Sequence, residues 1–114
     1  RSQAITAMDW FPTILDLCGV EKPKGKLDGH SLVGICKSPY VPSFHKVLHF
    51  QWHKKWVVRE GDWKLLGQEG RDKVSLHNLA DKKPEAKDYT AQKPELVTHL
   101  KKLHVAWAKD VFAK

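Results

Sequence analysis

The amino-acid sequence predicts an α+β fold, in which a small four-stranded antiparallel sheet is packed by a C-terminal helix and preceded by an N-terminal helix and a linker. Three patterns predict this. β-rich arms flank a Glu60-Gly61 turn signal, apolar residues alternate along residues 47–52, and apolar residues recur at helical spacing along residues 94–111. Because an isolated hairpin is marginal in water, the strands need one another and a covering helix.

The N-terminal helix is predicted to begin after Asp9, a good N-cap residue, and to run to about Cys18. Gly19 suits the C′ position at which many helices end. Four residues at helical spacing form one apolar stripe: Phe11, Ile14, Leu15 and Cys18. We expect this stripe to face the core, with Cys18 acting as a small buried hydrophobe.

A connecting segment is predicted to follow up to residue 44, because Lys, Pro and Gly are frequent and Asp28-Gly29 is a turn signal. Ser31 is predicted to cap a short helical piece that extends through Ile35. Pro39 and Pro42 then favour extended or turned backbone.

The first strand is predicted over residues 47–52, because its side chains alternate in polarity. Its apolar side consists of Leu48, Phe50 and Trp52. The following His53, Lys54 and Lys55 are expected to connect this strand to the hairpin.

The hairpin is predicted to turn at Glu60-Gly61. This turn sets Arg59 opposite Asp62, so that an opposite-charge pair closes the polar side. The period of two places four apolar residues on the other face: Trp56, Val58, Trp63 and Leu65. We expect this face to need a covering element.

Residues 67–73 are predicted to form a polar loop, and residues 74–78 a short fourth strand. Residues 81–92 are charged and contain Pro84, which favours another loop. Pro94 suits the first position of a terminal helix. The apolar stripe of that helix, which we expect to cover the Trp face of the sheet, is Leu96, Leu100, Leu103, Trp107 and Val111.

The 114 residues suit one small domain, and 20 Lys and Arg against 13 Asp and Glu give a net charge of +7. This excess favours polyanionic partners such as nucleic acid, sulfated or acidic glycans, or acidic membrane surfaces; a solvated basic face is the alternative. The two cysteines allow at most one disulfide. No apolar run approaches the roughly 20 residues of a membrane span, so we expect none. The chain starts without Met and enters a helix almost at once, so we expect a fragment or a processed piece.

Three histidines recur every four residues: His45, His49 and His53. On a helix this spacing can bring zinc ligands together, but four residues of strand cover about 13 Å, too far for one ion. Surface or cross-strand histidines are therefore favoured, and no metal site is assigned. We find no nucleophile elbow, phosphate-cradling Gly loop or paired catalytic carboxylates, so no catalytic residue is assigned either. Most Trp residues occupy core positions, which argues against nucleic acid as a partner.

Five segments stand in an order typical of one enzyme family. They are MDWFPTILDLCGV at residues 8–20, LDGHSL at 27–32, VREGDWKLL at 58–66, LHNL at 76–79 and PELV at 94–97. Together they closely resemble the C-terminal part of type I sulfatases, the arylsulfatase family of the alkaline-phosphatase-like superfamily. His77 departs from the Leu-Tyr-Asn-Leu of relatives, and Asp81-Lys-Lys-Pro-Glu85 from their Asp-Pro-x-Glu, which leaves the subfamily open.

The resemblance implies that residues 1–44 belong to the end of a catalytic domain and residues 45–114 form its C-terminal subdomain. It implies a parent sulfuric ester hydrolase that uses calcium and a formylglycine made from Cys in C-x-P-S-R. Neither Cys18 nor Cys36 matches that motif, so we expect no cofactor in this chain and no activity from it alone. The implied partners are the upstream catalytic domain and, in the parent, a sulfated substrate. The family also suggests a periplasmic or secreted location.

Trp52 and His53 are the candidate substrate-binding residues, because a loop at the end of a sheet with an aromatic face and a titratable donor suits an anionic sugar. The alternation of the first strand instead favours a core position for Trp52. The alternative to the sulfatase function is a stand-alone basic binding module for acidic glycans or nucleic acid.

Overall fold

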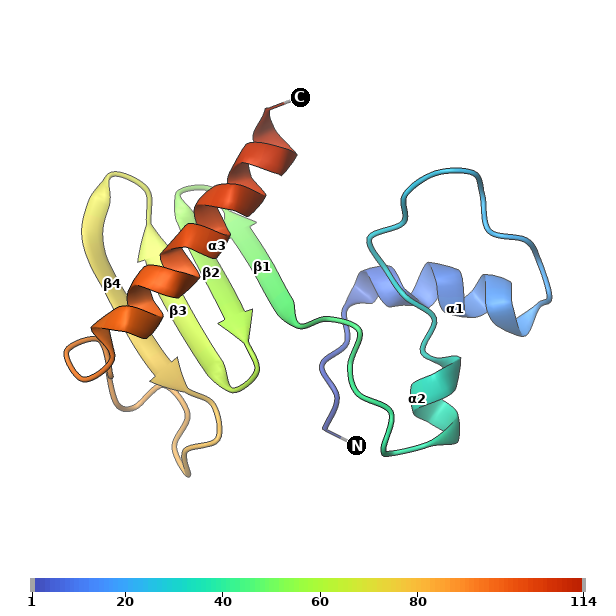
Figure 1. Cartoon of the computed structure of the whole chain (residues 1–114), viewed down its shortest axis with the longest axis horizontal. Helices are drawn as coiled ribbons and strands as arrows, with labels where there is room; N and C mark the ends of the chain where they lie inside the picture. The colour runs from blue at the N-terminus through green and yellow to red at the C-terminus, as the bar shows by residue number, and fades with distance from the viewer. Residues whose placement is uncertain (1, 114) are drawn as a thin grey trace. The chain divides into compact units, whose positions relative to one another are not determined.

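The computed structural model describes residues 2–113 and confirms the α+β class (Figure 1). The helical elements are η1 (Ala7–Asp9), α1 (Trp10–Leu17), α2 (Val33–Lys37) and α3 (Pro94–Phe112). Four strands form one antiparallel sheet in the order of the chain: β1 (Val47–Trp52), β2 (Lys55–Glu60), β3 (Trp63–Gln68) and β4 (Arg71–Asn78). The chain divides into two compact units, unit 1 (Arg1–His45) and unit 2 (Lys46–Lys114).

The end of α1 follows the expectation from the sequence. Gly19 has a φ of 65° and donates its N–H to the Asp16 carbonyl at 3.2 Å, while Val20 donates to the Leu15 carbonyl at 2.9 Å. These two bonds form a Schellman motif, in which glycine accepts the left-handed conformation without steric cost. Gly19 is therefore the C′ residue, as predicted.

Asp9 precedes α1 as expected, but its side chain does not cap that helix. Its fully buried carboxylate accepts hydrogen bonds from Thr6 N and His30 N, each at 2.8 Å, and contacts His45 Nε2 at 2.7 Å. Burial alone raises the pKa of a carboxyl group, but these bonds outweigh it and hold the pKa of Asp9 below its usual range. One carboxylate thus joins the beginning, the middle and the end of unit 1.

The apolar stripe of α1 is largely exposed, so its expected burial is wrong. The side of α1 that packs within unit 1 carries Pro12 and Thr13, and the Thr13 hydroxyl accepts the Leu32 N–H at 2.8 Å. Phe11 and Ile14 are 53% and 54% exposed, and Cys18 is an exposed thiol rather than a buried hydrophobe. The sequence pattern located the stripe but not the side of α1 on which the remaining chain packs.

The segment after α1 approaches the backbone of η1 closely. A Cβ on Gly29 would lie 2.0 Å from the Met8 carbonyl oxygen, so only glycine fits there. The short helix lies slightly later than predicted, at Val33–Lys37, and Ser31 Oγ accepts the Val33 N–H at 3.3 Å.

The hairpin between β2 and β3 turns at Gly61-Asp62, one residue later than predicted. Glu60 pairs with Trp63 and Arg59 with Lys64, so the expected Arg59–Asp62 pair is wrong. Gly61 has a φ of 58° at the first central position, the position at which a type II′ turn needs glycine. The register differs from the predicted one by two residues, and a two-residue shift leaves every side chain on the same face.

One face of the sheet is covered by α3, as expected (Figure 1). The buried cluster between them consists of Trp56, Val58, Leu65, Leu76, Val97 and Leu100. Trp63 lies on this face but is only half-buried, edge-on to Tyr89 with the ring centroids 5.5 Å apart. Leu96 and Leu103 pack against the cluster, whereas Val111 at the end of the predicted stripe is exposed.

Strand β1 turns its apolar side away from α3. His49 pairs with Val58 and Gln51 with Trp56, so His49 and Gln51 share the α3 face. Leu48, Phe50 and Trp52 therefore lie on the opposite side of the sheet, which we call the open face. Leu48 is buried, but Phe50 is 52% exposed.

The predicted loop at residues 67–73 is instead a tight hairpin, because β3 continues to Gln68 and β4 begins at Arg71. Only Glu69 and Gly70 connect them, and Gly70 has a φ of 74°. Residues 79–93 contain no helix or strand, in agreement with the loop expected at 81–92. Even the long α3 lacks the apolar composition of a membrane crossing, and no other helix among residues 2–113 has the required length and composition.

We predict that Leu65→Ala lowers the free energy of unfolding by about 2–5 kcal/mol, because Leu65 is fully buried in the core cluster and its truncation leaves a cavity. The matched control is Leu66→Ala, next to it on the open face, where we expect a loss of about 1 kcal/mol because Leu66 is only half-buried. Urea denaturation of both variants measures the difference. Equal losses would contradict the assignment of the two faces.

Two histidines lie between α3 and the sheet: His104 is buried and His49 is half-buried. The His104 ring stacks on Trp56 with centroids 4.2 Å apart, and the His49 ring stacks on Trp107 at 5.1 Å. Neither Nδ1 atom has a hydrogen-bond partner among residues 2–113. Burial lowers the pKa of both imidazoles; the charge of His104 lowers that of His49 further, and the charge of Glu69 partly opposes the shift at His104.

We predict that unit 2 loses stability as the pH falls from 6.5 toward 5. The unfolded chain binds protons with the ordinary histidine pKa near 6.5, whereas the native pKa values are lower, so acid favours the unfolded state. Urea denaturation at pH 7.5, 6.5 and 5.5 measures this loss. The double variant His49→Gln/His104→Gln should show a smaller loss over the same range. The prediction would be refuted if the stability of the unsubstituted chain stayed constant or increased as the pH falls.

Candidate functional site

Trp52 is the last residue of β1 and lies on the open face. Its side chain is 76% exposed, so the core position that the alternation favoured is wrong. The alternation itself is real, but the apolar side of β1 faces away from α3. An exposed indole is therefore available at the end of the sheet.

His53 follows as the first residue of the β1–β2 turn, with a φ of 53°. Its ring meets the Trp52 ring edge-on, with the centroids 4.9 Å apart and an interplanar angle of 84°. The two side chains line a shallow hollow together with Lys54, Lys55 and Gln68. The structure thus brings both candidate residues to one surface beside two lysines.

Hydrogen bonds hold this turn in place. Gln51 Nε2 donates to the His53 carbonyl at 3.3 Å and to Glu69 Oε1 at 2.9 Å. The Glu69 N–H in turn donates to the Lys54 carbonyl at 2.7 Å. The β1–β2 and β3–β4 turns are therefore tied together at the same end of the sheet.

The register places a row of polar and aromatic side chains across all four strands at this end. Trp52 pairs with Lys55, Lys55 with Gln68, and Gln68 with Arg71. We call these four residues the end row. The sequence pattern did not indicate Gln68 and Arg71, because both fall within the loop predicted at residues 67–73. The Glu69-Gly70 dipeptide is the signal that could have indicated a tight hairpin.

The three evenly spaced histidines do not meet. His45 bonds to Asp9 in unit 1, His49 faces α3, and His53 lies in the β1–β2 turn. Residues 2–113 contain no group of three or more His, Cys, Asp or Glu side chains placed to hold a metal ion. The calcium ion remains an implication of the sulfatase resemblance for the parent protein, and no chemical step is assigned to it.

The arrangement around Trp52 and His53 combines side chains that suit ligand binding. It offers an aromatic face, an imidazole and lysine ammonium groups, which suit anionic or sugar ligands. Neither a scan against protein-family models nor a search of curated proteins finds a match to this chain.

We predict that His53→Gly raises the free energy of unfolding by roughly 0.5–1 kcal/mol, because a left-handed conformation costs an L-residue about 1–2 kcal/mol and costs glycine almost nothing. The matched control is Lys54→Gly at the second turn position, where φ is not positive and glycine should lower stability. Thermal denaturation compares the two variants. Equal destabilisation by both would mean that the turn imposes no strain on His53.

Proposed function

We propose that this chain is the C-terminal part of a sulfatase, a sulfuric ester hydrolase, that packs on an upstream catalytic domain and helps to shape its substrate entrance. The observation that carries the proposal is the ordered set of five segments that resemble type I sulfatases. The four-stranded antiparallel sheet followed by a C-terminal helix is the architecture that this resemblance implies, so fold and motifs agree.

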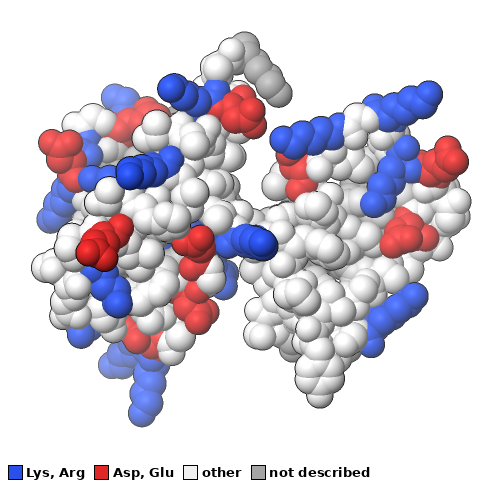
Figure 2. Space-filling view, viewed as in Figure 1, with Lys and Arg blue, Asp and Glu red and all other residues white. Residues whose placement is uncertain are grey.

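The exposed apolar side of unit 1 supports packing against the remainder of the catalytic domain, to whose end residues 1–44 belong in this proposal. Figure 2 shows a broad area of unit 1 without charged side chains, with Lys, Arg, Asp and Glu at its margins. The exposed large apolar residues of η1 and α1 are Met8, Trp10, Phe11, Ile14 and Leu17, each more than half exposed. Large exposed apolar patches mark interaction surfaces, and the adjoining catalytic domain is the partner that the motif order indicates.

The open face supports a role at the substrate entrance. Trp52 and His53 stand beside Lys54 and Lys55, so an anionic ester would meet an aromatic face and positive charge there. The sequence contains no C-x-P-S-R motif, and residues 2–113 contain no group of three or more His, Cys, Asp or Glu side chains placed to hold a metal ion. Its role in this proposal is positioning and binding, and the covalent chemistry belongs to the upstream domain.

The alternative is a stand-alone basic binding module for acidic glycans or nucleic acid. The net charge of +7 favours it, and the exposed side of α1 disfavours it, because a stand-alone domain rarely exposes so many large apolar side chains. The coding region upstream of residue 1 distinguishes the two functions. A C-x-P-S-R motif and paired Asp and Asn metal ligands there support the sulfatase, and their absence supports the module.

We predict that the isolated chain hydrolyses no aryl sulfate, because it encodes no activated nucleophile. The full-length protein should be active, and in it His53→Ala should raise KM or lower kcat on the natural ester with little change in thermal stability. His99→Ala is the matched control, since His99 is an exposed residue of α3 that bonds to Glu60 at 3.0 Å. Chelator-resistant turnover by the isolated chain, or identical kinetics of both variants, would overturn the respective part of the proposal.

A further inference from the structure

The open face of the sheet is built from three cross-strand rows. The end row is Trp52, Lys55, Gln68 and Arg71; the middle row is Phe50, Val57, Leu66 and Ser75; the far row is Leu48, Arg59, Lys64 and His77. None of these twelve positions, all within the described residues, carries an acidic side chain. The face therefore combines an apolar middle with cationic rows on both sides.

The far row is partly covered and neutralised by the loop of residues 79–93. Lys64 forms an ion pair with Glu85, and His77 Nδ1 bonds to the Lys87 carbonyl at 2.8 Å. The Lys64 ammonium lowers the pKa of Glu85, so this pair stays ionised well below neutral pH. These contacts fill the far end of the open face and leave the end row exposed.

The cations near the end row remain uncompensated. Lys55, Arg71 and Lys73 form no ion pair with any residue in the described range 2–113. On the α3 side of unit 2, Figure 2 shows Lys and Arg interspersed with Asp and Glu. The twelve positions of the three open-face rows, by contrast, include cationic side chains and no acidic one.

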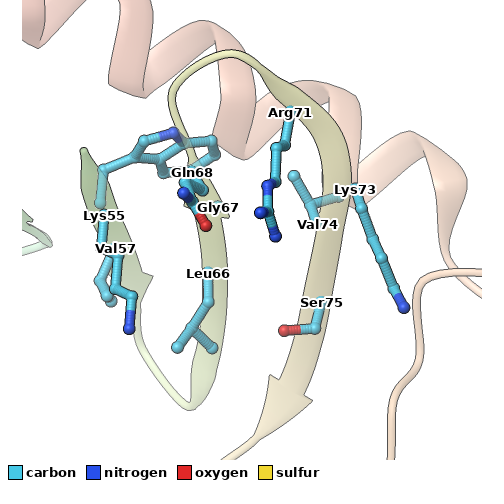
Figure 3. A pocket seen from close by; sticks show the side chains of 10 residues that line it. Lys55, Val57, Leu66, Gly67, Gln68, Arg71, Lys73, Val74 and Ser75 are labelled. Carbon is cyan, nitrogen blue, oxygen red and sulfur yellow. The ribbon is translucent and has the colours of Figure 1, made fainter.

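A hollow of about 420 Å³ lies beside these cations (Figure 3). Val57 and Leu66 give it an apolar part, and Gln68 and Ser75 add polar groups. Figure 3 shows the Arg71 side chain extending along the sheet in the direction of Leu66 and Ser75, while Lys73 projects from the outer edge of β4. The hollow shares Lys55 and Gln68 with the one lined by Trp52 and His53, so the two hollows are adjacent.

We infer that the end row and its hollow bind a sulfated glycan chain. The row crosses three strand spacings, about 14 Å, which suits an extended ligand better than a single anion. Arg71 offers a planar fork for a sulfate group, Lys55 and Lys73 offer ammonium groups, and Gln68 and Ser75 can bond to sugar hydroxyls. The exposed Trp52 indole supplies a flat apolar face for a sugar ring.

Nucleic acid fits this surface less well. Single-strand binding needs several exposed aromatic platforms along a basic groove. Among the described residues that line the hollow only Trp56 is aromatic, and it is buried and stacked on His104. Trp52 is the only aromatic residue of the end row. The choice of sulfate as the anionic group rests on the proposed sulfatase function. The charge and the geometry of the end row are independent of that function.

Binding of size-defined dextran sulfate to the 114-residue chain at about 150 mM salt tests the inference. The variant Arg71→Gln/Lys73→Gln should weaken binding by about tenfold or more, because it removes two charge-assisted hydrogen bonds. The matched control Lys102→Gln/Lys109→Gln removes the same charge from exposed positions of α3 and should change affinity less than about twofold. Unsulfated dextran of equal length should not bind measurably.

Backbone amide NMR signals of the unsubstituted 114-residue chain give a second readout that does not depend on a variant. Dextran sulfate should shift the signals of Gln68 and Ser75 and leave those of the exposed side of α3 unchanged. Equal weakening by both double variants, shifts spread over both faces, or no binding of dextran sulfate would each overturn the inference. Equally tight binding of oligothymidine through the same residues would also overturn it, in favour of a nucleic-acid surface.

The binding result can be interpreted independently of the proposed sulfatase function, because the binding assay requires neither an upstream domain nor turnover. Binding through the end row together with an upstream region that lacks C-x-P-S-R would retain the glycan site and reject the sulfatase. Conversely, the sulfatase function would be retained and the glycan site rejected if the full-length protein is an active sulfatase but its isolated C-terminal part does not bind dextran sulfate.

Discussion

The packing of α3 on one face of the sheet is the interaction on which the rest of unit 2 depends. Leu100 joins Val58, Leu65 and Leu76 in a buried cluster, and all four side chains are removed from solvent. Because side chains alternate along a strand, covering one face commits the intervening residues to the other. The exposure of Trp52, the row of cations and the hollow on the open face all follow from that single choice of side.

The packing of α3 on this face also places polar histidine side chains in the interface between α3 and the sheet. Strand β1 presents His49 to α3, and His49 and His104 stack on Trp107 and Trp56. Burial lowers the pKa of both imidazoles, and neither Nδ1 atom has a hydrogen-bond partner among the described residues, so protonation disfavours this interface. Unit 1 relies on a different device, the buried Asp9 carboxylate, which joins three of its segments through hydrogen bonds and leaves the apolar side of α1 outside.

The described residues present two distinctive surfaces. Unit 1 exposes large apolar side chains along α1, and unit 2 places an exposed indole beside lysine and arginine side chains at one end of its sheet. In the proposed sulfatase the reacting groups lie upstream, and the open face contributes binding energy and orientation. A surface of this kind can affect KM and specificity without touching the sulfur atom.

The sequence by itself determined the fold class, the extent of α3, the Gly19 helix end and the common face of Trp56, Val58 and Leu65, because local periodicity and glycine chemistry decide such features. Only the tertiary structure decided which side of each element is buried. Phe11 and Trp52 belong to correctly identified apolar stripes and are nevertheless exposed. Periodicity shows that residues share a face but carries no information on what packs against that face. Trp52, Lys55, Gln68 and Arg71 form one row only through the register of three hairpins. That register depends on turn positions, and the β2–β3 turn lies one residue later than the pattern predicts, while the β3–β4 turn replaces a predicted loop.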